Sequence, residues 1–222
     1  MDAQHQPPTR IASFDVGIRN LAVAVFDVID PGTGPCDYPA RLRYWELIDI
    51  YSDMPHGAPA MDCVVPALLR REALFEGVSD VLIEDQGIAR PPIQCVGAAI
   101  RATYDMHARQ SCPGTMRVHS VAPVHKLKAY KGPPLEEGEK TAARTSYTRN
   151  KRKAEQHTLA ILEAMGATFA HQFLQSHRKR DDLCDAFLQG VWGTQNPALL
   201  VKRPILEGVQ PMPHTLAFSA SK

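Results

Sequence analysis

Four acidic residues in three separate stretches have the types and spacing for metal chemistry. Asp15 lies at the end of a short apolar run in SFDVGIRN, and Glu84 ends the apolar run VLIE. Asp182 and Asp185 are three residues apart in KRDDLCDAFLQG, so a helix would place both carboxylates on one face. Carboxylates held close together are costly unless they share a cation. Plainer interpretations are that Asp15 faces water at the edge of a sheet and that Asp181 and Asp182 cap a helix N-terminus.

Carboxylates without histidine or cysteine partners favour a hard divalent cation. The five cysteines form no CxxC pair, and the nine histidines form no HxxxH pair on an expected helix, which makes a zinc site a poor candidate. Mg²⁺ or Mn²⁺ binds to a few carboxylates together with water and phosphate oxygens. Two such ions about 3.5–4 Å apart can activate a water and stabilise the leaving oxygen of a phosphodiester. The acids therefore predict a two-ion hydrolytic site with Asp15 as a bridging ligand.

The charge of the chain is unevenly distributed. Its 222 residues are enough for one domain with a sizeable core, and the net charge is only +1. Residues 126–180 contain twelve Lys or Arg against five Asp or Glu, a local charge of +7, which leaves −6 for the remainder. This asymmetry suits an enzyme that binds a polyanion, although a solvated basic loop and helix face would give the same pattern. The odd number of widely spaced cysteines favours an intracellular reducing compartment.

The chain is expected to form strands and helices that could bring the acids together. Apolar runs and periodicity predict strands at 11–14, 21–26, 41–51, 81–84 and 116–123, and helices at 62–76, 91–109, 149–165 and 179–192. Their order predicts an α/β protein with a mixed five-stranded sheet flanked by helices. This is the order of the ribonuclease H-like fold, although the pattern alone also allows other α/β sandwiches. Residues 125–148 read as a mobile loop. We expect one domain over 1–192 and an extended or disordered proline-containing tail over 193–222.

The helix expected at 179–192 is amphipathic. Two of its acids and one amide lie on the side away from the apolar stripe: Asp182, Asp185 and Gln189. The stripe itself is formed by Leu183, Cys184, Phe187, Leu188 and Val191. The acids are therefore expected on a polar face of the helix, where they can reach a shared cation.

Six stretches of the sequence, taken in order, carry a resemblance to a known family. They are SFDVGIRNLAVAVFD, VLIEDQ with PPIQCVGAAIRATY, VAPVHKLKAYKG, YTRNKRKAEQH and KRDDLCDAFLQG. Together they resemble the Holliday junction resolvases of large cytoplasmic DNA viruses, poxviruses included, which in turn resemble fungal mitochondrial and RuvC-type bacterial resolvases. The resemblance covers about residues 11–192. It implies a homodimer that cuts four-way DNA junctions with Mg²⁺ or Mn²⁺, and it suggests a viral protein of the host cytoplasm.

The resemblance also implies roles for individual residues. The family's catalytic tetrad, which holds the metal ions, matches Asp15, Glu84, Asp182 and Asp185. Asp181, four residues before Asp185, is an alternative partner in the helix. The lysine that the family places near the scissile phosphate matches Lys151, which could equally be a solvated lysine. Asp85 departs from several relatives, which have a basic or neutral residue there. Phosphate contacts without base readout are expected from Lys126, Lys128, Arg152, Lys153, Arg178, Lys179 and Arg180.

These expectations favour a Mg²⁺-dependent, structure-selective endonuclease that resolves four-way DNA junctions by water attack on a phosphodiester. A second hypothesis is a ribonuclease H-like nuclease acting on other branched or RNA–DNA hybrid substrates. A third is an actin-like ATPase, which is disfavoured because the sequence contains no second phosphate-binding DxG hairpin. A fourth is a nucleic-acid-binding module without catalytic activity.

Overall fold

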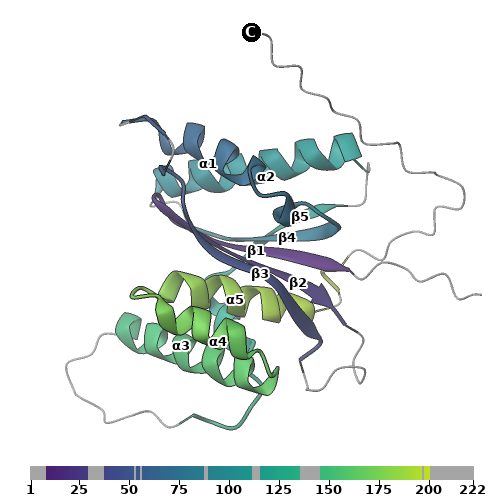
Figure 1. Cartoon of the computed structure of the whole chain (residues 1–222), viewed down its shortest axis with the longest axis vertical. Helices are drawn as coiled ribbons and strands as arrows, with labels where there is room; N and C mark the ends of the chain where they lie inside the picture. Colours follow the sequence, from purple (N-terminus) through teal and green to yellow (C-terminus); the bar gives the residue numbers. More distant parts are fainter. Residues whose placement is uncertain are drawn as a thin grey trace, which may run out of the picture.

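The computed structural model contains a five-stranded mixed sheet with helices on both faces (Figure 1). It describes residues 9–29, 38–52, 54–55, 57–87, 90–111, 116–135, 146–196 and 198–200. The strand order is β3-β2-β1-β4-β5, made of β1 (Arg10–Val16), β2 (Asn20–Val28), β3 (Ala40–Asp49), β4 (Val78–Glu84) and β5 (Arg117–Val121). The first three strands are antiparallel, whereas β4 is parallel to β1 and β5 is parallel to β4. The predicted fold class is confirmed.

Two layers of helices cover the sheet. One face carries α1 (Ala60–Leu69) and α2 (Pro91–Ser111), and the other carries α3 (Ser146–Ala164), α4 (Thr168–Ser176) and α5 (Asp181–Thr194) (Figure 1). Two short 3-10 helices follow α1 and β5, namely η1 (Glu72–Leu74) and η2 (Pro123–Lys128). None of the helices in the described ranges is both long enough and apolar enough to span a bilayer.

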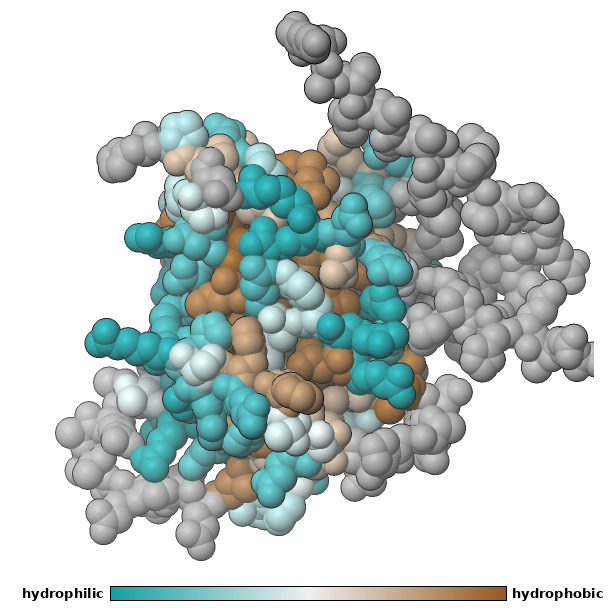
Figure 2. All heavy atoms as spheres, in the orientation of Figure 1, coloured by the Kyte–Doolittle hydropathy of each residue, from teal (hydrophilic) through white to brown (hydrophobic). Residues whose placement is uncertain are grey.

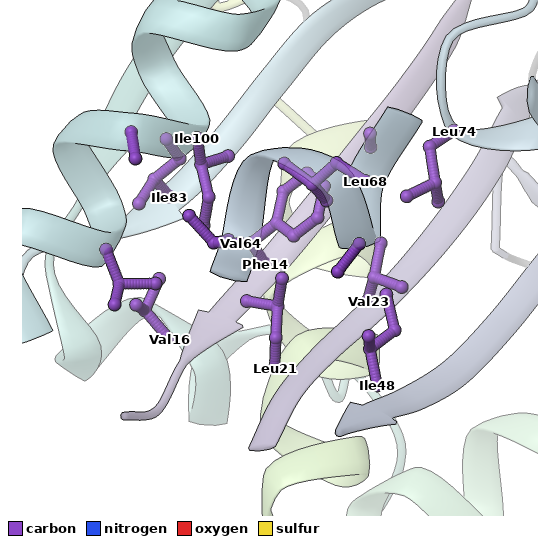
Figure 3. Close-up of a cluster of buried hydrophobic side chains, with 14 of the residues drawn as sticks. Phe14, Val16, Leu21, Val23, Ile48, Val64, Leu68, Leu74, Ile83 and Ile100 are labelled. Atoms are coloured by element: carbon purple, nitrogen blue, oxygen red, sulfur yellow. The ribbon is translucent and has the colours of Figure 1, made fainter. Parts of the chain in front are cut away.

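The central strands are buried on both faces, and their alternation assigns each side chain to one layer. Phe14 and Val16 of β1 face α1 and α2, where they pack with Val64, Leu68 and Ile100 (Figure 3). The intervening β1 residues therefore point toward α5. Small side chains on that face of β1 and β2 leave room for the helix to lie close to the sheet: Ser13, Ala22 and Ala24.

The surface shown in Figure 2 has hydrophobic areas that are interrupted by hydrophilic side chains. Large apolar side chains that are exposed include Leu69 on α1, Met106 on α2 and Phe169 on α4. Such scattered residues are normal for a folded protein and do not define a binding site by themselves.

The structure differs from the sequence prediction mainly in the helices. The sequence patterns do not predict α4, which has only nine residues and buries Leu174 against its neighbours. The helix expected at 62–76 ends at Leu69 and is followed by η1. The expected loop at 125–148 begins with the last four residues of η2 and ends within α3, while 136–145 lies outside the described residues. Most of the predicted tail, 201–222, also lies outside them.

Candidate metal-dependent active site

The register of two parallel strands places Asp15 beside Glu84. Phe14 of β1 lies opposite Ile83 of β4, so the next residue of each strand is an acid at its carboxyl end. Phe14 and Ile83 belong to the core under α1 and α2, and the two acids therefore point toward α5. The tight turn after β1 requires Gly17, because a Cβ there would lie 2.3 Å from the backbone oxygen of Asn20. Sheet pairing thus brings two of the predicted acids together.

Lys126 of η2 lies between three carboxylates. Its Nζ is 3.1 Å from Asp15 Oδ1, 2.9 Å from Glu84 Oε1 and 2.9 Å from Asp185 Oδ2. Only 6% of the Lys126 side chain is exposed. The sequence predicts this lysine as a phosphate contact, and the structure places it inside the site as the shared partner of three acids.

Contacts with α5 and with Gln195, the residue directly after it, hold η2 in this position. The Gln195 side-chain amide donates to the backbone oxygen of Ala129, directly after η2, at 2.9 Å. The ring of His125 stacks on Trp192, with centroids 4.3 Å apart. The sequence signal for this position is that Lys126 follows β5 closely. Val121 at the end of β5 pairs with Glu84 in the parallel register, so the chain after β5 continues beside that acid.

Burial and neighbouring charges act in opposite directions on the pKa values of the acids and the lysine in this site. Burial raises the pKa of Asp15 to about 7, and its hydrogen bond with the Glu84 carboxyl contributes, although the Lys126 charge acts against the rise. Burial also raises the pKa of Asp185 despite Lys126. For Lys126, burial favours a lower pKa, but the charges of Asp15, Asp185 and Glu84 outweigh it and raise the pKa of the ammonium. The site therefore holds more negative charge than one lysine neutralises.

The other two acids of α5 are held by different lysines. Asp182 pairs with Lys179 three residues earlier, and Asp181 pairs with Lys151 of α3. Burial raises the pKa of Asp182 although its hydrogen bond with Lys179 acts against the rise, and the charges of Asp181 and Asp15 add to it. Burial acts to raise the pKa of Asp181 as well, but its hydrogen bond with Lys151 and the charges of Lys179 and Lys151 together outweigh burial and lower the pKa.

Lys151 therefore lies at the rim of the site and not among the three central acids. Its Nζ also lies 4.6 Å from the centroid of the Tyr147 ring. The remaining residues predicted to contact phosphate lie on or near the surface. Arg180 is half-buried and pairs with Glu155, whereas the exposed ones are Lys128, Arg152, Lys153, Arg178 and Lys179.

The donor set of the site fits a hard divalent cation. Asp15, Glu84 and Asp185 supply only oxygen donors, and their excess negative charge is the type that Mg²⁺ or Mn²⁺ neutralises. Within the described part of the chain, no three His, Cys, Asp or Glu side chains form a ready metal-binding group. The Lys126 ammonium lies where their oxygens converge, so a cation would have to share these oxygens with the ammonium or displace it.

No protein-family model and no curated protein matches the sequence. The structure is similar to the fowlpox virus Holliday junction resolvase, with a TM-score of 0.55 and 17% identity over 85% of this chain and 99% of that one. The fold is ribonuclease H-like. The structure is also similar to RuvC of Thermus thermophilus in complex with a Holliday junction substrate, with a TM-score of 0.55 and 14% sequence identity. This match covers 86% of this chain and 96% of that one. The match to the yeast mitochondrial Holliday junction resolvase has a TM-score of 0.51 and 12% sequence identity, and it covers 89% of this chain and 84% of that one. These likenesses establish the fold.

Removing the Asp15 charge is expected to stabilise the metal-free protein at neutral and higher pH. The pKa of Asp15 lies above its ordinary value of 3.8 in the folded state, so the stability that comes from its protonation is complete below about pH 4 and is lost as the pH rises toward 7. The Asp15→Asn variant does not lose this stability as the pH rises, because asparagine does not ionise. Thermal unfolding with EDTA should show Tm several degrees above that of the wild type at pH 8, with a smaller difference at pH 4. A lower Tm for Asp15→Asn at pH 8 would contradict the assignment.

Proposed function

We propose that this protein is a divalent-metal-dependent endonuclease that resolves four-way DNA junctions. The observation that carries the proposal is the convergence of Asp15, Glu84 and Asp185 on one cationic group at the carboxyl ends of β1 and β4. In α/β sheets, this edge is where ligands bind. The similarity of the whole fold to three Holliday junction resolvases supports the choice of substrate.

Each part of the site has a role in this proposal. Asp15, Glu84 and Asp185 would hold Mg²⁺ or Mn²⁺, with Asp182 as the fourth ligand once Lys179 releases it. The metal would supply activation of a water and stabilisation of the leaving 3′ oxygen of the phosphodiester. Lys126 keeps the acids together and adds a positive charge where negative charge develops on the phosphate.

The DNA backbone would be held by the basic surface beside the acids. Lys151 and Lys179 lie at the edge of the site, where they form ion pairs with Asp181 and Asp182. Exposed basic residues would contact phosphates farther from the acids, namely Lys128, Arg152, Lys153 and Arg178. Recognition would depend on junction shape and backbone charge, so affinity should fall steeply with salt. Paired cuts in a junction with two-fold symmetry would require two copies of the chain, which favours a homodimer.

A cleavage panel tests the proposal. The substrates are a four-way junction, a three-way junction, a flap, a linear duplex and an RNA–DNA hybrid, each with Mg²⁺, Mn²⁺ or EDTA. We expect paired nicks across the four-way junction with either metal and no cutting with EDTA. Preferential cutting of the hybrid or the flap would instead indicate a ribonuclease H-like nuclease of different specificity, and binding without cutting would indicate a non-catalytic module.

A further inference from the structure

One polar side chain of α5 is buried where the three acid-bearing elements meet. Gln189 is fully buried, although the helical pattern predicts it on the polar face together with Asp185. It lies one helical turn after Asp185, and its side chain points into the interface with the sheet. A buried amide costs free energy unless it forms hydrogen bonds, and an apolar side chain would fill this space without that cost. Its presence therefore indicates that its hydrogen bonds matter.

The amide of Gln189 ties α5 to both strands of the site. Its Nε2 donates to the backbone oxygen of Phe14 at 3.2 Å, directly before Asp15, and to the backbone oxygen of Leu82 at 3.2 Å, two residues before Glu84. It also lies 3.1 Å from Ser13 Oγ. Two of these three partners are carbonyl oxygens, which only accept hydrogen bonds, so the NH₂ group and not Oε1 must face the sheet.

A glycine beside Gln189 allows this close approach. A Cβ on Gly190 would lie 2.3 Å from the ring of Phe26 and 3.2 Å from Ser13 Cβ. Any larger residue would push α5 away from the sheet and stretch the Gln189 hydrogen bonds. The close packing at Gly190 and the hydrogen bonds of Gln189 both hold α5 against the sheet. Together they therefore set the distance of Asp185 from β1 and β4.

We propose that Gln189 is a positioning residue that sets how closely Asp15, Glu84 and Asp185 approach a shared metal ion. The inference rests on the proposed function, because the shared ion is the one that the nuclease chemistry requires. Gln189 does not contact the metal or the DNA itself. It acts through the two strand backbones that carry the acids, in the way that groups behind metal ligands orient them and alter metal affinity by about 10–100-fold when replaced.

Gln189→Met tests this role, because methionine has a similar length but donates no hydrogen bond. The matched control is Thr194→Val, which removes a buried polar group of the same helix whose hydrogen bond goes to Val191 within α5. We expect calorimetric Mn²⁺ titration of the DNA-free protein to show about tenfold weaker binding for Gln189→Met and wild-type affinity for Thr194→Val. If Gln189→Met does not fold, Gln189→Asn keeps an amide that is too short to reach both strands and is expected to weaken binding similarly.

Amide hydrogen exchange of the metal-free proteins provides a second readout. Exchange should become faster in Gln189→Met at the carboxyl ends of β1 and β4 and in the first turn of α5, but not in Thr194→Val. Equal exchange and equal Mn²⁺ affinity in the two variants would overturn the proposal. If the wild type neither binds Mn²⁺ nor cuts a junction, the proposed function fails, and the exchange comparison still decides whether Gln189 positions the acids.

Discussion

Asp185→Asn is expected to reduce junction cleavage by about a thousandfold or more while the protein stays folded. The substitution removes one of three carboxylates that surround Lys126 and keeps the size of the side chain. Metal coordination contributes several kcal/mol to transition-state stabilisation in such reactions, and each 1.36 kcal/mol is a factor of ten in rate. The measurement is single-turnover cleavage of a labelled four-way junction with Mg²⁺, together with a thermal unfolding curve.

Asp105→Asn is the matched control, because Asp105 is an exposed aspartate of α2 on the opposite face of the sheet. It should cleave at the wild-type rate. Wild-type cleavage by Asp185→Asn would show that the acids around Lys126 are a structural ion cluster and not the active site. The same assay separates the two acids that precede Asp185, since we expect Asp182→Asn to abolish cleavage and Asp181→Asn to retain it.

Phe187→Ala is expected to destabilise the protein by about 3–5 kcal/mol, the usual cost of truncating a buried phenylalanine. Phe187 is fully buried between α5 and the sheet, with its ring centroid 5.4 Å from that of Phe26 and 5.2 Å from that of Trp45. Truncation leaves a cavity beneath the helix that carries Asp185 and Gln189. Urea unfolding followed by circular dichroism measures the loss.

Phe169→Ala makes the same chemical change at an exposed position of α4. Phe169 is 88% exposed, so its truncation should change the free energy of unfolding by less than about 0.5 kcal/mol. A similar loss of stability in both variants would mean that α5 does not pack against the sheet as described.

Local sequence patterns predicted the five strands of the sheet. β1 and β4 are short apolar runs that end near an acid, and the order of elements predicts the mixed five-stranded sheet. That β1 and β4 are neighbours is a finding of the structure. Helical periodicity likewise predicted α5 within two residues at each end. Strand runs and helical periodicity depend on side chains that are close together in the sequence, so they can be recognised from about ten consecutive residues.

The sequence alone therefore determined the five strands, most of the helices, and the placement of acids at strand ends and on a helix. Only the tertiary structure decided that Lys126 is buried among them, because that ammonium meets Asp15 across 111 residues of chain. The same holds for Gln189, whose amide contacts Phe14 from 175 residues away. A polar residue on a helix is exposed or buried according to what packs over it, and no local periodicity contains that information. The contacts that hold the acids of the site together are thus made between residues far apart in the sequence, and only folding brings these residues into contact.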